Sequence, residues 1–185
     1  MIELNRWWKI FLKSNEELIK NEDIQRLYAR LTSSGIYSNE YPMLTEILYS
    51  VGVNPLHYLK TIPYKFLDSW QPEAILTIPD NIQAIGYTAI RGVTLKKLII
   101  GKGIQWMRAF SIVCSEIDAI YLPNTIKGLD ADTFSGCNIL TLYFDGTEEE
   151  YLNLFTFYDT SMSIEDTLTY LGFKQPSGIS IIFNK

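Results

Sequence analysis

The chain has 185 residues, of which 47% are hydrophobic, 14% aromatic and 20% charged, and its formal net charge is -5. This composition argues against a disordered chain and suffices for one domain or two small ones. The negative charge disfavours nonspecific DNA binding over the whole surface. Residues 1–72 balance at eight basic and eight acidic side chains, whereas residues 73–185 have eight basic and thirteen acidic ones and so carry the whole net charge.

Residues 1–72 are predicted to form short helices. Pro42 is suited to begin a helix that ends at Gly52, and Asn54-Pro55 has the pattern of a cap followed by a first-turn proline. A last helical turn is expected over residues 61–67. Short helices bury little surface alone, so we expect this region to act as a cap on the next part of the chain or as an interaction domain.

From residue 73 onward the sequence repeats at a constant offset of 22 residues. Three segments can be superposed without gaps: Ile78–Ile82, Ile100–Ile104 and Leu122–Ile126. An apolar residue recurs just upstream of each unit: Leu76, Leu98, Ile120 and Leu142. A fixed period in this range is typical of a solenoid, whose units bury their apolar residues against one another.

Each repeat is predicted to contain one short strand, because apolar residues two apart precede turn residues. The expected strands are residues 74–78, 95–100, 117–122 and 139–144. Helical turns are expected between the strands, at Ala89-Ile90, Ala109-Phe110 and Thr133-Phe134. Tight bends are expected at Gly92, Gly128 and Gly136. The expected fold class is therefore α+β, with helices capping a small β-rich solenoid.

The last part of the chain is predicted to cover the open end of the solenoid. Asp145-Gly146-Thr147 followed by three glutamates predicts a turn and then a helix whose first residues are acidic. A second helix at 164–171 and a strand at 179–183 follow. Covering the last strand is physically expected, since an uncovered edge strand invites aggregation.

The repeats resemble the BspA-like leucine-rich repeats of bacteria, protists and viruses. Segments 76–86 and 122–126 resemble the strand and Ile-Pro part of that pattern, Thr133–Cys137 resembles its Ala-Phe-x-Gly-Cys part, and 142–151 resembles its terminal segment. The middle unit departs, with Gly101 in place of proline. The resemblance covers residues 73–152 and implies a solenoid domain over 73–185. It also implies an adhesion or binding role, and small members of the family occur in bacteriophage genomes.

Little in the sequence indicates a membrane protein or a secreted one. No signal peptide and no apolar run long enough to span a bilayer is found, so we expect a cytoplasmic protein. Trp7, Trp8 and Phe11 are interpreted as core packing, with a membrane-touching helix as the alternative. Cys114 and Cys137 lie 23 residues apart, so a disulfide between neighbouring coils is one outcome. Two buried thiols in a reducing compartment are the favoured interpretation.

Catalytic motifs are lacking, and we expect no enzyme, no cofactor and no metal site. His57 is the only histidine and is assigned a packing or surface role. Asp130 and Asp132 lie two residues apart, but no further acidic ligands follow them, so a solvated turn is the preferred interpretation.

The predicted partner-binding site is a stripe on the outer face of the strands. The repeat period aligns outward residues of neighbouring strands, and the stripe comprises Lys97, Ile99, Tyr121 and Tyr143. The alternative is that the N-terminal helices or the C-terminal segment cover this face. A second candidate, for phosphate or an acidic partner, comprises Arg91, Lys96, Lys102 and Arg108.

The leading hypothesis is a non-enzymatic intracellular protein-binding module, a monomer or weak homo-oligomer. The resemblance suggests a virus-encoded (phage) protein that binds or inhibits a host protein. Two alternatives remain: a structural or assembly protein that oligomerises through the repeat face, and a nucleic-acid binder that uses the Arg91–Arg108 stretch.

Overall fold

The protein is described from a computed structural model. This structure describes residues 12–13, 20, 22, 25–26, 45–46, 48–49, 52, 54–69, 74–155 and 161–184. The chain divides into two compact units, Met1–Pro55 and Leu56–Lys185. Most of the first unit, including Trp7, Trp8 and Phe11, lies outside the described residues.

The described residues of the first unit include the end of a predicted helix. Leu48 is fully buried. Gly52 has φ 78°, and its N–H donates to the carbonyl of Tyr49 at 3.0 Å, as expected of a glycine that ends a helix. The 3-10 helix η3 (Pro55–Tyr58) then follows Asn54, so the first-turn proline is found where it was predicted.

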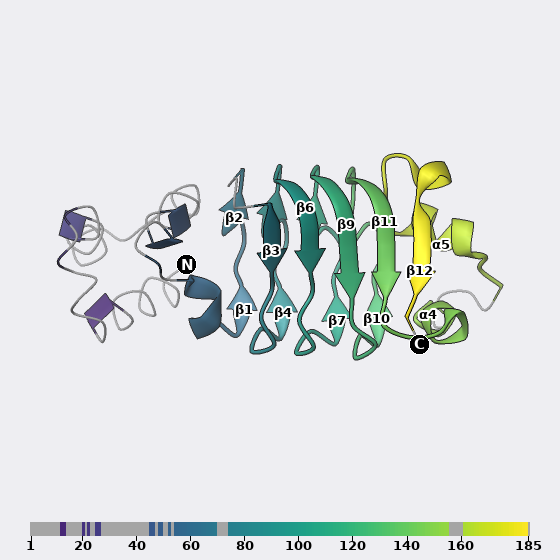
Figure 1. The fold of residues 1–185 in the computed structure, drawn as a ribbon, viewed down its shortest axis with the longest axis horizontal. Helices are drawn as coiled ribbons and strands as arrows, with labels where there is room; N and C mark the ends of the chain where they lie inside the picture. Colours follow the sequence, from purple (N-terminus) through teal and green to yellow (C-terminus); the bar gives the residue numbers. More distant parts are fainter. Residues whose placement is uncertain are drawn as a thin grey trace. The chain divides into compact units, whose positions relative to one another are not determined.

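The second unit is a stack of coils whose largest surface is a five-stranded parallel sheet (Figure 1). Its strand order is β12-β11-β9-β6-β3. The strands are β3 (Ile75–Thr77), β6 (Thr94–Ile99), β9 (Glu116–Leu122), β11 (Asn138–Phe144) and β12 (Ser180–Phe183). The predicted strands and their parallel stacking are confirmed.

Two-residue strands form the remaining faces of the coils. One narrow sheet contains β2 (Leu67–Asp68), β5 (Ile90–Arg91) and β8 (Ile112–Val113). Two parallel pairs lie on another face: β1 (Thr61–Ile62) with β4 (Ala84–Ile85), and β7 (Trp106–Met107) with β10 (Gly128–Leu129). The described part of the chain thus holds four coils before β12, each contributing one strand to the large sheet.

The strand register confirms the 22-residue period. On the large sheet Leu76 pairs with Leu98, Leu98 with Ile120, and Ile120 with Leu142. All four side chains are at most 3% exposed. Each of these side chains packs against its counterpart in the neighbouring coil, so every coil supplies the apolar surface against which the next one is buried. Burying a leucine or isoleucine side chain fully contributes about 1.5–3 kcal/mol to the stability of the fold.

The strict alternation expected of these strands is interrupted. Leu95 and Leu98 both point inward although they are three residues apart, and Lys96 and Lys97 between them are both exposed. The N–H groups of these two lysines donate to the same carbonyl, that of Ala74, at 2.8 and 3.1 Å. This local bulge restores the inward direction of Leu98 and of the residues after it.

Within residues 61–67, the expected helical turn is found only at residues 64–66, where the N–H of Phe66 donates to the carbonyl of Pro63 at 3.2 Å. The strands β1 and β2 occupy the two ends of this range, and their partners lie 23 residues further along, at β4 and β5. Two-residue strands are too short to show an alternating pattern, so their sequence does not distinguish them from a helical turn. The repeats therefore begin before residue 73, whereas a capping or interaction role for residues 1–72 stays a prediction.

Of the three helical turns expected further along, the one at Ala89-Ile90 is wrong because β5 begins at Ile90, whereas Ala109-Phe110 and Thr133-Phe134 do lie in turns. The strand register pairs Ile90 with Ile112, as the 22-residue offset predicts, so the structural counterpart of Ala89 is Ser111. Ser111 is buried, and its hydroxyl keeps a hydrogen-bond partner there by donating to the carbonyl of Arg108 at 2.6 Å. Phe110 is instead half-buried at a corner, with φ 58°.

Of the three glycines assigned to bends, two are confirmed. Gly92 and Gly136 have φ 61° and 69°, the left-handed region that glycine adopts without strain. Gly128 lies inside β10, and its lack of a side chain serves packing against Trp106.

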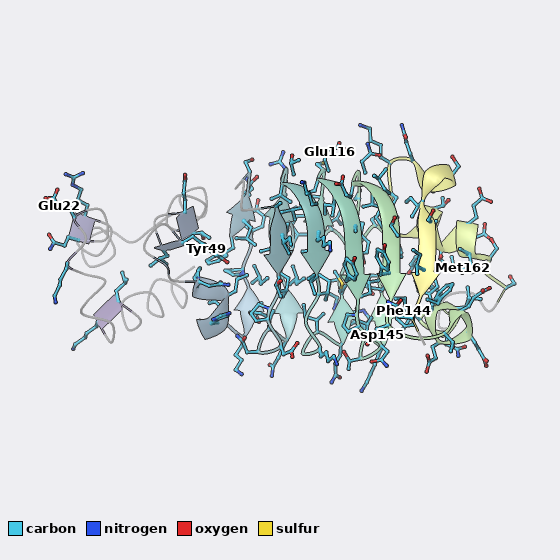
Figure 2. All side chains as sticks on the ribbon, in the orientation of Figure 1. Glu22, Tyr49, Glu116, Phe144, Asp145 and Met162 are labelled. Carbon is cyan, nitrogen blue, oxygen red and sulfur yellow. The ribbon has the colours of Figure 1, made fainter. Side chains whose placement is uncertain are left out.

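The C-terminal segment covers the last coil, as predicted. The helices are α4 (Glu148–Asn153) and α5 (Ile164–Tyr170), and the 3-10 helix η4 (Pro176–Gly178) leads into β12. After α5, backbone carbonyls of residues 170–172 accept from the N–H groups of Asp132, Phe134 and Gly136. Behind the sheet, the buried Phe144 contacts Tyr151 of α4 at a ring-centroid distance of 5.6 Å, whereas the next residue, Asp145, is exposed (Figure 2).

Candidate functional site

Three of the four residues of the predicted stripe lie in one column of paired residues on the outer face of the large sheet, whereas Lys97 lies in the neighbouring column, paired with Ile75 and Ala119. Thr77 pairs with Ile99, Ile99 with Tyr121, and Tyr121 with Tyr143. The column continues onto β12, where Tyr143 pairs with Ile182. The strand register alone therefore aligns one side chain from each of five strands.

The two tyrosines of this column are stacked and half-buried. The ring centroids of Tyr121 and Tyr143 are 4.3 Å apart and the ring planes are 1° from parallel. The ammonium group of Lys97 lies 5.8 Å from the Tyr121 ring centroid. Aromatic pairs contribute about 0.5–1.5 kcal/mol beyond their buried area. The stack therefore holds both rings in one orientation before any partner arrives.

A second wall stands opposite this column, built by the turns that follow the strands. Asp80 accepts a hydrogen bond from the N–H of Lys102 in the next coil at 2.7 Å. Gly101, which replaces proline in the middle repeat, lies so close to the backbone of Ile78 and Pro79 that a Cβ there would clash. The departure from the repeat pattern is thus a packing requirement of the turn.

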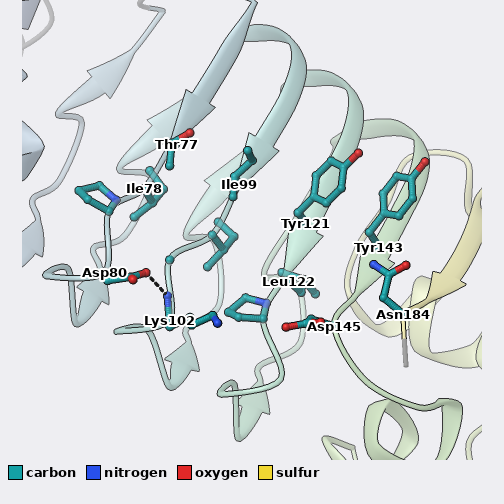
Figure 3. A pocket seen from close by; sticks show the side chains of 14 residues that line it. Thr77, Ile78, Asp80, Ile99, Lys102, Tyr121, Leu122, Tyr143, Asp145 and Asn184 are labelled. Atoms are coloured by element: carbon teal, nitrogen blue, oxygen red, sulfur yellow. Dashed lines mark hydrogen bonds between the residues drawn. The ribbon is translucent and has the colours of Figure 1, made fainter.

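Between the two walls runs a groove of about 480 Å³ that crosses the strands, here called the tyrosine groove (Figure 3). Ile99, Tyr121 and Tyr143 lie along one side, and Asp80, Lys102 and Asp145 along the other. The groove is lined by Thr77, Ile78, Pro79, Asp80, Ile99, Ile100, Gly101, Lys102, Tyr121, Leu122, Pro123, Tyr143, Asp145 and Asn184. An apolar lining with a few charged groups at the rim is the usual composition of a binding site.

The four residues of the basic candidate are not brought together. Arg91 lies in β5 and is 3.7 Å from the carboxylate of Asp68. Arg108 follows β7 and is 3.7 Å from the carboxylate of Asp130. Lys96 lies on the large sheet, and Lys102 lines the tyrosine groove. Because successive faces of each coil carry these residues, the basic stretch does not form one patch.

Several groove residues escaped the sequence-based prediction. Asp80 sits 22 residues before Lys102, so the repeat offset was a signal that could have paired them. Asn184 lies after β12, outside the repeats, and no periodic signal marked it.

A second exposed aromatic row was also missed. Tyr64 and Tyr87 are 45% and 59% exposed, with ring centroids 6.2 Å apart, and Phe110 contacts Tyr87 at 5.7 Å. These rings lie at the corner after β1 and β4, away from the large sheet.

Both cysteines are free thiols, which agrees with the favoured interpretation, but only Cys137 is buried. Burial raises the pKa of the Cys137 thiol to about 12. Cys114 is exposed because it occupies the same corner position as Gly92 and Gly136, with φ 49°.

Acidic and histidine side chains do not gather into a site within the described part of the chain. No group of three or more histidine, cysteine, aspartate or glutamate residues there is placed to hold a metal ion. Asp130 accepts from the indole N–H of Trp106 at 2.7 Å, so its carboxylate has a structural role. His57 is exposed. None of the helices described is both long and apolar enough to cross a bilayer.

Comparison with protein families identifies the repeats. The model of the BspA type leucine rich repeat region matches residues 58–164 in six copies, which is more than half of the chain. The chain belongs to the BspA-type leucine-rich-repeat family. No curated protein and no solved structure matched the chain. Leucine-rich repeats of this kind indicate a protein-interaction module on a scaffold that is typically non-enzymatic.

Proposed function

We propose that this BspA-type repeat protein is a non-enzymatic protein-binding module that holds its partner in the tyrosine groove. The observation that carries the proposal is the stacked pair Tyr121 and Tyr143, which lines an open groove on the repeat sheet. Half-buried tyrosines that are already ordered lose little conformational freedom on binding. Tyrosine is also one of the residue types enriched among binding hot spots.

The surroundings of the pair support a site for a macromolecule. Ile182 is 40% exposed at one end of the column, and Ile75 is 52% exposed beside Thr77 at the other. The outer face of the large sheet thus presents apolar side chains over its whole width. An exposed apolar stripe flanked by charged residues is a feature of protein interfaces.

The test is capture of a partner from a lysate of the organism that encodes the chain, with two matched double variants. Tyr121→Ala/Tyr143→Ala removes the groove pair, and Tyr64→Ala/Tyr87→Ala removes a stacked tyrosine pair outside the groove. We expect one dominant partner, lost from the groove variant and retained by the control. Truncating one hot-spot tyrosine costs about 2 kcal/mol, or roughly a 30-fold weaker dissociation constant.

Other outcomes contradict the proposal in distinct ways. A partner retained equally by both variants would move the site away from the groove. Self-association of the wild type that the groove variant abolishes, seen by light scattering, would favour the assembly alternative. A virus-encoded inhibitor of a host protein stays a prediction from the family resemblance.

A further inference from the structure

The tyrosine groove runs at right angles to the strands. Its apolar wall takes one residue from each successive strand: Thr77, Ile99, Tyr121 and Tyr143. A linear ligand in the groove therefore meets an equivalent position at every strand spacing, about 4.8 Å. Only a ligand whose own repeat matches one or two of these spacings contacts every position in the same way.

The polyproline II helix has this repeat. It has three residues per turn and a rise of about 3.1 Å, so the same side of the peptide returns every 9.3 Å or so, close to two strand spacings of about 4.8 Å. An α-helix repeats about every 5.4 Å and drifts out of step by about 0.6 Å at each strand. An extended strand presents the same side about every 6.7 Å, which matches neither one spacing nor two.

The chemistry of the groove suits the same conformation. Tyr121 and Tyr143 provide aromatic rings and hydroxyl groups, and a polyproline II peptide docks in aromatic-lined grooves. Its backbone carbonyls make no internal hydrogen bonds, so they are available to accept from tyrosine hydroxyls. Prolines three residues apart would contact residues two strands apart, such as Ile99 and Tyr143.

One end of the groove adds a charge requirement. Asp145 is exposed on the rim next to Tyr143, and within the described residues it makes no ion pair. Asp80, the other rim acid, is already held by a hydrogen bond from the backbone N–H of Lys102. A basic side chain in the ligand would therefore pair with Asp145.

We propose that the tyrosine groove binds a proline-rich segment of the partner, in the polyproline II conformation and across the strands, with a basic residue beside Asp145. This inference rests on the proposed function, because it specifies what the groove holds. A segment of about five residues would span the four strands, given a rise of about 3.1 Å per residue.

The test is direct binding of a fluorescent peptide to the full chain, measured by anisotropy. The probe is a short run of prolines that ends in arginine. The control peptide has the same length and arginine, with alternating glycine and serine in place of the prolines. We expect the proline peptide to bind at least about tenfold more tightly than the control. Equal affinity for the two peptides, or no binding of the proline peptide up to about 1 mM, would overturn the proposal.

Variants locate the peptide within the groove. Tyr121→Ala should weaken binding about tenfold, whereas Tyr87→Ala, at an exposed tyrosine outside the groove, should leave it unchanged. Asp145→Asn should weaken binding of the arginine peptide and not of its glutamine counterpart. The affinity of each variant is compared with that of the wild type only if the two proteins have the same melting temperature. Binding that is insensitive to Tyr121→Ala would contradict the assigned site.

The outcome separates this inference from the proposed function. If the captured partner depends on Tyr121 and Tyr143 but the proline peptide does not bind, the proposed function stands and the inference fails. If capture does not depend on the tyrosines either, both fail. A dimer that Tyr121→Ala dissociates, without peptide binding, would show that a second copy occupies the groove and would overturn the inference.

Discussion

The indole ring of Trp106 lies directly over Gly128, its partner across the parallel pair β7–β10. A Cβ on Gly128 would come within 2.5–2.7 Å of three carbons of that ring. The ring is held in place by a hydrogen bond from its N–H to Asp130 at 2.7 Å, and the guanidinium of Arg108 lies 5.8 Å from a ring centroid. A side chain at residue 128 must therefore displace a ring that is fixed by its other contacts.

Gly128→Ala should destabilise the fold by about 1–3 kcal/mol, the usual cost of overpacking. Gly178→Ala is the control, because no atom lies within 4 Å of a Cβ built there. Urea unfolding followed by circular dichroism measures both. Equal stability of the two variants would show that the Trp106 ring moves aside freely.

The stacked tyrosines should be coupled in stability as well as in binding. In a double-mutant cycle with Tyr121→Ala and Tyr143→Ala, we expect a coupling free energy of about 0.5–1.5 kcal/mol. The same cycle at Tyr64 and Tyr87, whose ring centroids are 6.2 Å apart, should give a smaller value. Additive effects at Tyr121 and Tyr143 would contradict the stacking.

Thr147 caps helix α4 through its side chain. Its hydroxyl accepts from the N–H of Glu150 at 3.2 Å, and the Glu150 carboxylate accepts from the N–H of Thr147 at 2.8 Å. Thr147→Ala should cost about 1 kcal/mol of unfolding free energy. Thr147→Ser keeps the hydroxyl and should restore most of it. A loss of the same size in both variants would assign the effect to the methyl group instead.

The two thiols should differ in reactivity. In the native protein, a thiol reagent should modify the exposed Cys114, and Cys114→Ser should abolish that reaction. Cys137 should react only on unfolding, because burial keeps it protonated. Rapid labelling of Cys137 in the folded Cys114→Ser variant would contradict its burial.

The pKa of Cys137 also predicts how stability depends on pH. The folded-state pKa is raised from 9.0 to about 12, so between these values the unfolded chain loses this proton while the folded chain keeps it. This contribution to stability is complete below pH 9 and falls as the pH rises toward 12. Cys137→Ala should flatten the decline in unfolding free energy over that window. An unchanged slope would contradict the shift.

Sequence periodicity predicted the large sheet well and the other faces poorly. The ladder of paired inward residues from Leu76 to Leu142 has one residue per coil at a constant offset of 22. The strands that carry these residues are three to seven residues long, which is long enough for the sequence to show which side is apolar. The two-residue strands β1 and β2 have no such pattern, so residues 61–67 resembled a helical turn. Phe110 was grouped with Ile90 and Phe134 because it follows an alanine, whereas the strand register pairs Ile90 with Ile112, two residues further on.

The candidate site, like the fold, was predicted from the sequence only in part. The sequence by itself determined the period and the inward direction of the ladder from Leu76 to Leu142, and therefore the outward column of Ile99, Tyr121 and Tyr143 one residue further on, because both are local properties of a regular chain. Only the tertiary structure decided which residues face one another across coils and faces. It separated Arg91 from Lys102 and placed Asn184 beside Tyr143, since such neighbours depend on how the chain turns between strands.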